Sequence, residues 1–177
     1  MHAVVNRITP VHRGRVFQLV TENITLSSGV TVDVDVIRHP GAAAMVPLLD
    51  PKTVLLLRQY RHALGGCIWE IPAGTLNPRE TVEACARREL VEETGYSARD
   101  FEKLGEITPL PGYADERVHL FLASGLTPAA QDLDADEMLS VHPTPLAEAL
   151  DMIFNGTIQD AKTITGLLLA ERRLRSG

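Results

Sequence analysis

Apolar and polar residues alternate along the first third of the chain in the manner of β-strands. Residues 30–37 place valine at every second position between Thr and Asp, which predicts a strand with one apolar face. A shorter strand is expected at residues 15–20. Two continuous apolar runs, residues 42–49 and 53–57, flank an Asp50-Pro51 turn and predict a hairpin buried on both faces. This hairpin should form the centre of the fold.

The middle of the chain contains one further strand candidate and the best-defined helix. The strand is expected at residues 67–71, before a break at Pro72-Ala73-Gly74. The helix is expected at residues 78–94, with Asn77 as its N-cap, Glu80 at capping-box spacing and Gly95 after its last turn.

The last part of the chain predicts two strands and then two helices. The strands are expected at residues 103–107 and 118–123, and an acidic loop follows at residues 132–137. The helices begin near Pro145 and near Asp160. This mixed order favours an α+β or layered α/β fold in which one domain spans residues 1–177.

Composition narrows the classes of partner. The 177 residues carry a formal net charge of −6, which leaves no excess of Lys and Arg to neutralise a nucleic acid backbone. Residues 1–10 lack the features of a signal peptide and no apolar run could span a bilayer, so we expect a cytoplasmic protein without membrane contact. Cys67 and Cys85 lack any zinc or redox spacing and are expected in the core.

Three carboxylates of the central helix point in similar directions. The predicted buried stripe includes Ala86 and Leu90, and at 100° per residue Glu89 and Glu93 fall inside it, with Glu92 on the neighbouring ridge. Salt bridges to arginine on a solvated face would explain Glu92 but would leave two like charges facing the core. A bound divalent cation removes that penalty, and a site of carboxylates alone favours Mg²⁺, which Mn²⁺ can replace.

The segment from Gly74 to Tyr96 resembles the Nudix box. That pattern requires Gly, then Glu after five residues, and then, after seven more, Arg-Glu-apolar-any-Glu-Glu-any-Gly-apolar. Its fixed positions are matched here by Gly74, Glu80, Arg88, Glu89, Leu90, Glu92, Glu93, Gly95 and Tyr96. The resemblance implies the Nudix fold, a mixed β-sheet sandwiched between helices, to which the N-terminal antiparallel strands are added.

The resemblance also implies roles for the residues of the box. Glu89, Glu92 and Glu93 become metal ligands, and the backbone carbonyl of Ala73 adds an oxygen. Arg88 orients the glutamates by salt bridges, and Glu92 and Arg88 are therefore included among the residues that serve catalysis.

Segments outside the box resemble the ADP-ribose pyrophosphatases of this family. They are Pro111-Gly112-Tyr113, Arg58-Gln59-Tyr60-Arg61 and the run from Trp69 to Gly74. The resemblance implies that Arg61 contacts a diphosphate and that Glu70 faces substrate and metals, with Arg58 as a further substrate-binding candidate. Trp69 is expected in the core.

The general base of this subfamily comes from an acidic loop after the sheet. Glu137 is the expected base because it directly precedes the apolar residues 138–141. Asp136 is the competing candidate and Glu116 a weaker one. The alternative is that residues 132–137 are only a solvated acidic loop.

The resemblance implies Mg²⁺-dependent cleavage of ADP-ribose to AMP and ribose 5-phosphate. Other substrates stay open: GDP-mannose, ADP-glucose or a dinucleoside polyphosphate. A sensor that binds a nucleotide sugar without cutting it is the non-enzymatic alternative, against which the complete set of box glutamates argues. By analogy the protein is expected to be a homodimer to which the strands of residues 1–40 contribute.

Overall fold

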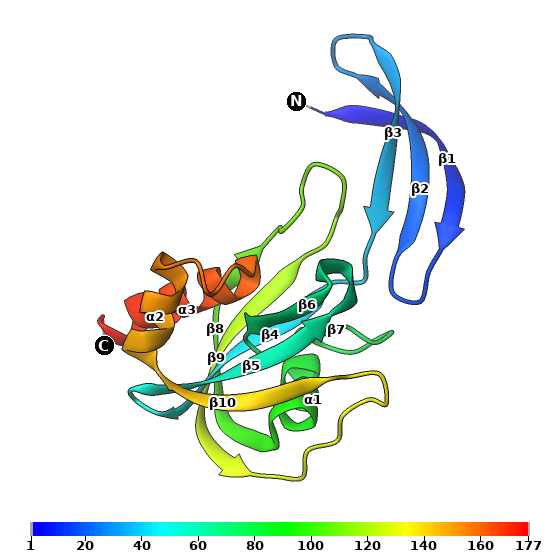
Figure 1. The fold of residues 1–177 in the computed structure, drawn as a ribbon. Helices are drawn as coiled ribbons and strands as arrows, with labels where there is room; N and C mark the ends of the chain where they lie inside the picture. Colours follow the sequence, from blue (N-terminus) through cyan, green and yellow to red (C-terminus); the bar gives the residue numbers. More distant parts are fainter. Residues whose placement is uncertain (1, 177) are drawn as a thin grey trace. The chain divides into compact units, whose positions relative to one another are not determined.

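The computed structural model describes residues 2–176, which form two compact units. One unit consists of Met1–Gly41 and Thr108–Arg117, and the other of Ala42–Ile107 and Val118–Gly177. Figure 1 shows both in the colours of the sequence.

The first unit is a three-stranded antiparallel sheet in the order β1-β2-β3. Its strands are β1 (Ala3–Arg13), β2 (Gln18–Leu26) and β3 (Thr31–Arg38). The segment Thr108–Arg117 adds to β3, because the Ile37 N–H donates to the Tyr113 carbonyl (2.8 Å) and the Asp115 N–H donates to the Ile37 carbonyl (3.1 Å). Arg38 ties the two parts together by ion pairs with Glu22 of β2 and Asp115.

The strand expected at residues 30–37 is confirmed, whereas β1 was not predicted. Residues 3–13 mix valine with His, Asn, Arg and Pro, so no period of two is visible, and every residue of the strand is exposed. The short strand expected at residues 15–20 begins later, at Gln18, and continues to Leu26.

The second unit is built on a mixed sheet whose main path runs β10-β5-β4-β9-β8, with β6 beside β5 and β7 beside β4. Its strands are β4 (Ala42–Asp50), β5 (Thr53–Arg61), β6 (Gly66–Glu70), β7 (Ala73–Thr75), β8 (Tyr96–Ile107), β9 (Val118–Pro128) and β10 (Leu139–Pro145). The helices are α1 (Val82–Thr94), α2 (Leu146–Phe154) and α3 (Ala161–Leu174), and a 3₁₀ turn occupies His62–Leu64. The β4–β9 pair is parallel and the other pairs are antiparallel.

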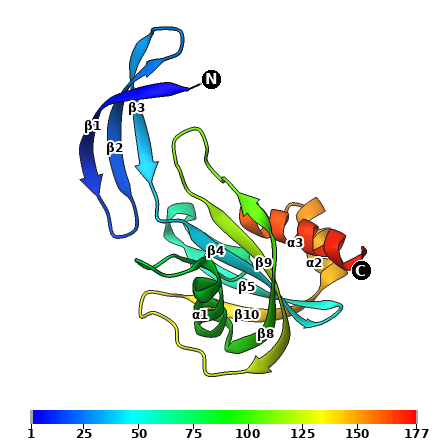
Figure 2. The ribbon, with the colours of Figure 1, turned by 180° about the vertical axis from the view of Figure 1, so that it is seen from behind.

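The sheet lies between α1 on one face and α2 with α3 on the other (Figures 1 and 2). Alternation along β4 creates the two cores, since successive side chains of a strand point to opposite faces. Ala44 and Val46 join the cluster that contains Leu167 of α3. Ala43 and Met45 join the cluster that contains the buried residues of α1. The predicted fold, a mixed sheet sandwiched between helices, is confirmed.

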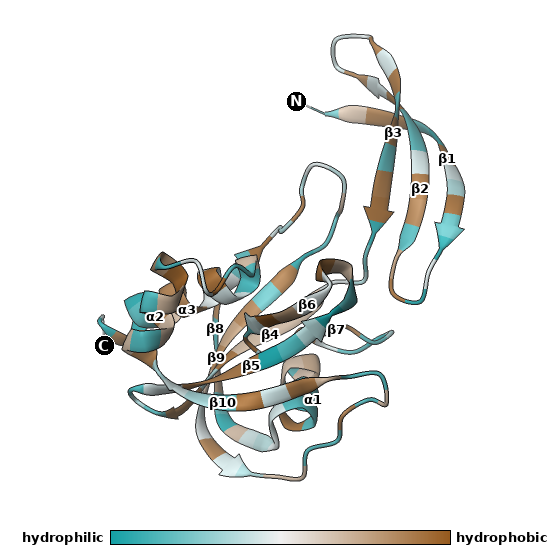
Figure 3. Cartoon of the chain, in the orientation of Figure 1, coloured by the Kyte–Doolittle hydropathy of each residue, from teal (hydrophilic) through white to brown (hydrophobic). Residues whose placement is uncertain are grey.

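The predicted central hairpin is also confirmed. Strands β4 and β5 pair across the Asp50-Pro51 turn, with Leu48 opposite Val54. Their middle residues are buried on both faces. Figure 3 shows mainly apolar colours along β4 and hydrophilic colours toward the end of β5, whose last four residues are Arg-Gln-Tyr-Arg. No helix within residues 2–176 is long and apolar enough to cross a membrane.

The start of the central helix differs from the prediction. Helix α1 begins at Val82, and its N-cap is Thr81, whose hydroxyl accepts from the Ala84 N–H (3.2 Å). Asn77 and Glu80 instead close a separate turn, in which the Glu80 carboxylate accepts from the Asn77 N–H (2.9 Å). Asn77 and Glu80 have the spacing of a capping box, but their hydrogen bond closes this turn and does not cap α1. Gly95 ends the helix in the left-handed conformation, as expected.

Two strands and one cysteine also depart from the sequence analysis. Strand β7 is too short to show a pattern, and β10 contains two prolines, which are unusual inside strands. Cys67 is exposed on β6, so only Cys85 is a core residue.

Candidate active site

The box glycine and the carboxylates of α1 meet where β7 passes the helix. A Cβ atom built on Gly74 would lie 1.8 Å from both Cδ and Oε1 of Glu89. No residue with a side chain fits here unless Glu89 moves. The glycine therefore lets the backbone of β7 lie directly against the carboxylate of Glu89.

Glu93 is the buried member of the carboxylate group. It is 1% exposed, and one oxygen accepts from the Ala73 N–H at 2.8 Å. Burial raises the pKa of Glu93 to about 8; the Ala73 hydrogen bond acts against this shift, and the nearby charges of Glu89 and Glu137 act with it. An ionised Glu93 is therefore costly unless a positive charge approaches it.

Arg88 holds the other box carboxylates. Its Nη1 lies 2.6 Å from Glu89 and 2.8 Å from Glu92, while Nε and Nη2 contact Glu80 at 2.9 and 3.0 Å. The hydrogen bond from Arg88 holds the pKa of Glu80 at about 2. These contacts suit the role expected for Arg88, which is to orient the glutamates.

The donor set suits a hard divalent cation. Burial raises the pKa of Glu89, and the charges of Glu92 and Glu137 add to that effect, so several acidic groups lie close enough to repel one another. Within residues 2–176 these carboxylates are not arranged as a preformed cluster of three ligands, since Glu89 and Glu92 face Arg88. Carboxylate oxygens are nevertheless the ligands that Mg²⁺ and Mn²⁺ prefer, and the carbonyl of Ala73 lies in the same segment as Gly74.

The acidic loop is tied to the end of α1. The side-chain amide of Gln131 donates to the Glu93 carbonyl (2.6 Å), and the Asp132 N–H donates to the Glu92 carbonyl (3.2 Å). This places Glu137 near enough for its charge to raise the pKa of Glu89 and Glu93. Glu137 is half-buried and also closes a turn with Asp134, whereas Asp136 is exposed.

Arg61 and Glu70 form a second charged group beside the first. Two nitrogens of Arg61, Nε and Nη2, each lie 2.7 Å from an oxygen of Glu70. Lys162 of α3 contacts the same carboxylate. Burial alone would raise the pKa of Glu70, but the hydrogen bonds and charges of Arg61 and Lys162 outweigh it and lower the pKa. Glu93 is close enough to raise the pKa of Arg61, so the two groups adjoin.

The structure does not bring Arg58 to this group. Arg58 and Arg61 lie three positions apart on β5, so their side chains leave opposite faces of the sheet. The guanidinium of Arg58 lies 5.4 Å from the centre of the Trp69 ring. Trp69 packs against the core on the α2 and α3 side, as expected. The substrate-binding role of Arg58 stays a prediction.

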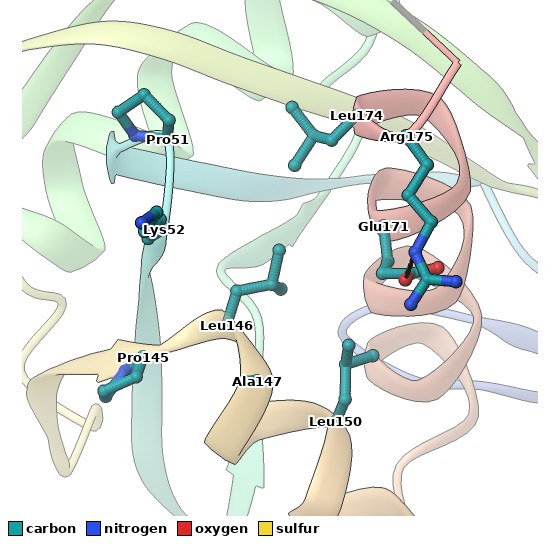
Figure 4. Close-up of a pocket in the computed structure, with 9 residues that line it drawn as sticks. All are labelled: Pro51, Lys52, Pro145, Leu146, Ala147, Leu150, Glu171, Leu174 and Arg175. Atoms are coloured by element: carbon teal, nitrogen blue, oxygen red, sulfur yellow. Dashed lines mark ion pairs between the residues drawn. The ribbon is translucent and has the colours of Figure 1, made fainter.

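The weaker base candidate, Glu116, belongs to the first unit, where it lies 3.7 Å from His39, and its role stays a prediction. A mainly apolar cavity of about 580 Å³ lies in the second unit, between the β4–β5 turn, α2 and the end of α3 (Figure 4). None of the candidate site residues lines it.

Nothing in the sequence indicated that Asp160, Lys162 and Thr163 are neighbours of the site. Asp160 was recognised only as the start of a helix, and nothing distinguished Lys162 from a surface lysine. Their contacts reach Glu70 and Ile71 across about ninety residues of sequence, as the separation of 92 between Lys162 and Glu70 shows. A helix start so far from the box gives no local signal of such contacts.

The raised pKa of Glu93 predicts how stability depends on pH. In metal-free protein Glu93 ionises near 8, but in the unfolded chain near 4.5, so the native state holds an extra proton between these values. The free energy of unfolding should therefore fall as the pH rises from 4.5 to 8, by up to about 5 kcal/mol from this group. Glu93→Gln should remove that fall, as measured by chemical denaturation in EDTA.

Glu83→Gln is the matched control, because Glu83 is exposed on the same helix and should leave the pH dependence unchanged. Parallel curves for the parent and the Glu93→Gln protein would contradict the prediction.

Comparisons with known proteins show which family the chain belongs to. The model of the NUDIX domain matches residues 38–167. The chain is 37% identical over 155 residues to an ADP-ribose pyrophosphatase of Bacillus subtilis (strain 168), covering 86% of this chain and 84% of the relative. It is 38% identical over 156 residues to a methanol dehydrogenase activator of Bacillus methanolicus, covering 87% and 84%.

A solved structure described as that of an ADP compounds hydrolase shares the fold. Its TM-score is 0.87 at 24% identity, over 99% of this chain and 96% of the other. The family model covers more than half of the chain and includes the carboxylate helix with the strands that position it. The chain therefore belongs to the Nudix family.

Proposed function

We propose that the protein hydrolyses the pyrophosphate bond of ADP-ribose, giving AMP and ribose 5-phosphate, in a reaction that requires Mg²⁺. The observation that carries the proposal is the meeting of Glu89 and Glu93 at Gly74, with the Arg61–Glu70 pair adjoining them. A diphosphate suits such a site, because the carboxylates can bind cations that neutralise it and the arginine can donate to its phosphate oxygens. The similarity to the Bacillus subtilis ADP-ribose pyrophosphatase supports the choice of substrate.

Glu89, Glu92, Glu93 and the Ala73 carbonyl would hold the cation. When bound, Mg²⁺ supplies Lewis-acid stabilisation of the diphosphate charge and acidifies water, and Mn²⁺ can take its place. Arg88 keeps Glu89 and Glu92 directed to one side of α1 through its hydrogen bonds to both. Arg61 would bind the diphosphate, since its side chain is partly exposed and its charge is permanent.

Glu137 would accept the proton of the attacking water. Its charge is felt by both Glu89 and Glu93, and it is less exposed than Asp136. Both features favour Glu137 as the general base, because a base must reach the water beside the scissile bond.

The test of this function is turnover of ADP-ribose with Mg²⁺, with the products separated by chromatography. The parent protein should release AMP and ribose 5-phosphate, and Glu93→Gln should lose at least about a hundredfold in kcat, as expected when charge stabilisation of the transition state is removed. Glu83→Gln should keep full activity.

Turnover by Glu93→Gln equal to that of the parent would contradict the proposed cation site. Preferential cleavage of GDP-mannose, ADP-glucose or a dinucleoside polyphosphate in the same assay would contradict the assigned substrate but support the assigned reaction, hydrolysis of a pyrophosphate bond. Binding of ADP-ribose without cleavage of any of these compounds would favour the sensor.

The choice of base predicts different losses for two neighbouring variants. Glu137→Gln should lower kcat by about a hundredfold or more, within the range typical of general acid–base catalysis. Asp136→Asn should stay within about threefold of the parent. Steady-state kinetics over pH 6–9 measures both, and a loss confined to Asp136→Asn would overturn the assignment.

We also propose that a second copy of the chain covers the N-terminal sheet. Four large apolar residues of β1, Val4, Val5, Ile8 and Val11, are each about half exposed, at 58, 48, 54 and 57%. So much apolar surface on one strand is typical of an interface. A homodimer through residues 1–40 would bury it. The cytoplasmic location and the lack of a nucleic acid partner stay predictions from the sequence.

Charges on β1 should disrupt this dimer. The double variant Ile8→Lys, Val11→Lys should elute as a monomer in size-exclusion chromatography with light scattering, because burying an unpaired lysine is costly. Phe154→Lys is the matched control, since Phe154 is 80% exposed on α2 and should leave the mass unchanged. A parent protein that is monomeric, or a dimeric double variant, would contradict the proposal.

A further inference from the structure

Glu70 is a buried carboxylate with two cationic partners. It is 1% exposed, and both of its oxygens accept from Arg61. Lys162 donates to Oε2, the oxygen that also accepts from Nη2 of Arg61. A single carboxylate thus shares its charge between a guanidinium and an ammonium.

Lys162 reaches Glu70 from the first turn of α3. The Lys162 ammonium also lies 3.0 Å from Asp160, the N-cap of that helix. The Thr163 hydroxyl accepts from the Ile71 N–H (2.8 Å) and donates to Asp160 (2.6 Å). The start of α3 is therefore attached both to the side chain of Glu70 and to the backbone that follows it.

Arg61 keeps part of its guanidinium available. Nε and Nη2 are used by Glu70, whereas Nη1 makes no hydrogen bond to any residue in the described part of the chain. The side chain is 40% exposed. The free nitrogen can therefore donate to an anion from solvent, provided that Glu70 keeps the guanidinium in this orientation.

We propose that Lys162 is a positioning residue for Arg61: by sharing Glu70 with Arg61, it holds the guanidinium in the orientation that binds the diphosphate. The inference rests on the proposed hydrolysis and deepens it, since it assigns a residue of α3 to substrate binding. Lys162 itself need not touch the substrate.

The charges explain why the second cation matters. With Lys162 present, the charges of Arg61 and Lys162 balance those of Glu70 and Asp160. Without Lys162, the two carboxylates leave one excess negative charge beside Arg61. Arg61 should then attract the substrate less strongly, and Glu70 should lose the contact that fixes one of its oxygens.

This role can be separated from the stability of the helix. The N-cap of α3 is made by Asp160, which accepts from the N–H and the hydroxyl of Thr163 without help from Lys162. Lys162→Met keeps that cap and much of the apolar stem. Lys162→Arg restores a cation that can reach Glu70.

The experiment measures KM and kcat for ADP-ribose with Mg²⁺ and, separately, the Kd of ADP-ribose in EDTA, where the contribution of the cation is removed. Lys162→Met should raise KM and Kd about tenfold, the size expected for a lost charge-assisted contact, with kcat within about threefold. Lys162→Arg should return both constants to within about threefold of the parent. Lys52→Met is the matched control, because Lys52 lies at the β4–β5 turn, away from these residues.

A double-mutant cycle distinguishes positioning from a general structural effect. If Lys162 acts through Arg61, then Arg61→Met with Lys162→Met should bind no more weakly than Arg61→Met alone. Additive losses in the cycle would overturn the inference, and so would unchanged Kd and KM in Lys162→Met.

The two proposals fail in different ways. A parent protein that binds ADP-ribose without cleaving it, while Lys162→Met binds it about tenfold more weakly, would overturn the proposed hydrolysis and keep the role of Lys162. Cleavage by the parent with full binding by Lys162→Met would overturn only the role of Lys162. A parent protein that neither binds nor cleaves ADP-ribose would overturn both.

Discussion

The burial of the Glu93 carboxylate is the constraint on which the site depends. An acidic side chain on the core-facing side of α1 opposes folding when it is ionised, and the Ala73 N–H and the charge of Lys162 offset only part of this cost. The buried carboxylate lies where β7 contacts α1. Gly74 makes that approach possible, because any side chain there would overlap with Glu89.

The neighbouring charges follow from this constraint. Arg88 forms ion pairs with Glu80, Glu89 and Glu92 but makes no contact with Glu93, so the buried carboxylate has no cation from this arginine. Arg61 is held by Glu70 beside it, and Glu70 in turn is held from α3. The two faces of the sheet thus contribute differently. Helix α1 supplies the carboxylates, while the start of α3 supports the arginine proposed to bind phosphate.

Much of the fold and the centre of the site could be predicted from the sequence, because both have local patterns. The buried hairpin shows continuous apolar runs, and the box has fixed spacing on one helix. The start of α1 was misplaced because Asn77 and Glu80 satisfy each other in a turn of their own. Strands β1 and β10 lack alternation, since one is exposed throughout and the other is rich in polar residues and proline. The role proposed for Lys162 depends on a contact across 92 positions, for which no local pattern exists.

The most direct test of the account is the binding of Mg²⁺ measured by calorimetry at pH 7 in two buffers of different ionisation enthalpy, for the parent and the Glu93→Gln protein. Because the pKa of Glu93 is about 8 without a cation, the parent should release close to one proton on binding Mg²⁺. Glu93→Gln should release almost none and bind at least about tenfold more weakly. Equal affinity and equal proton release in the two proteins would contradict the claim that Glu93 is the buried carboxylate around which the site is built.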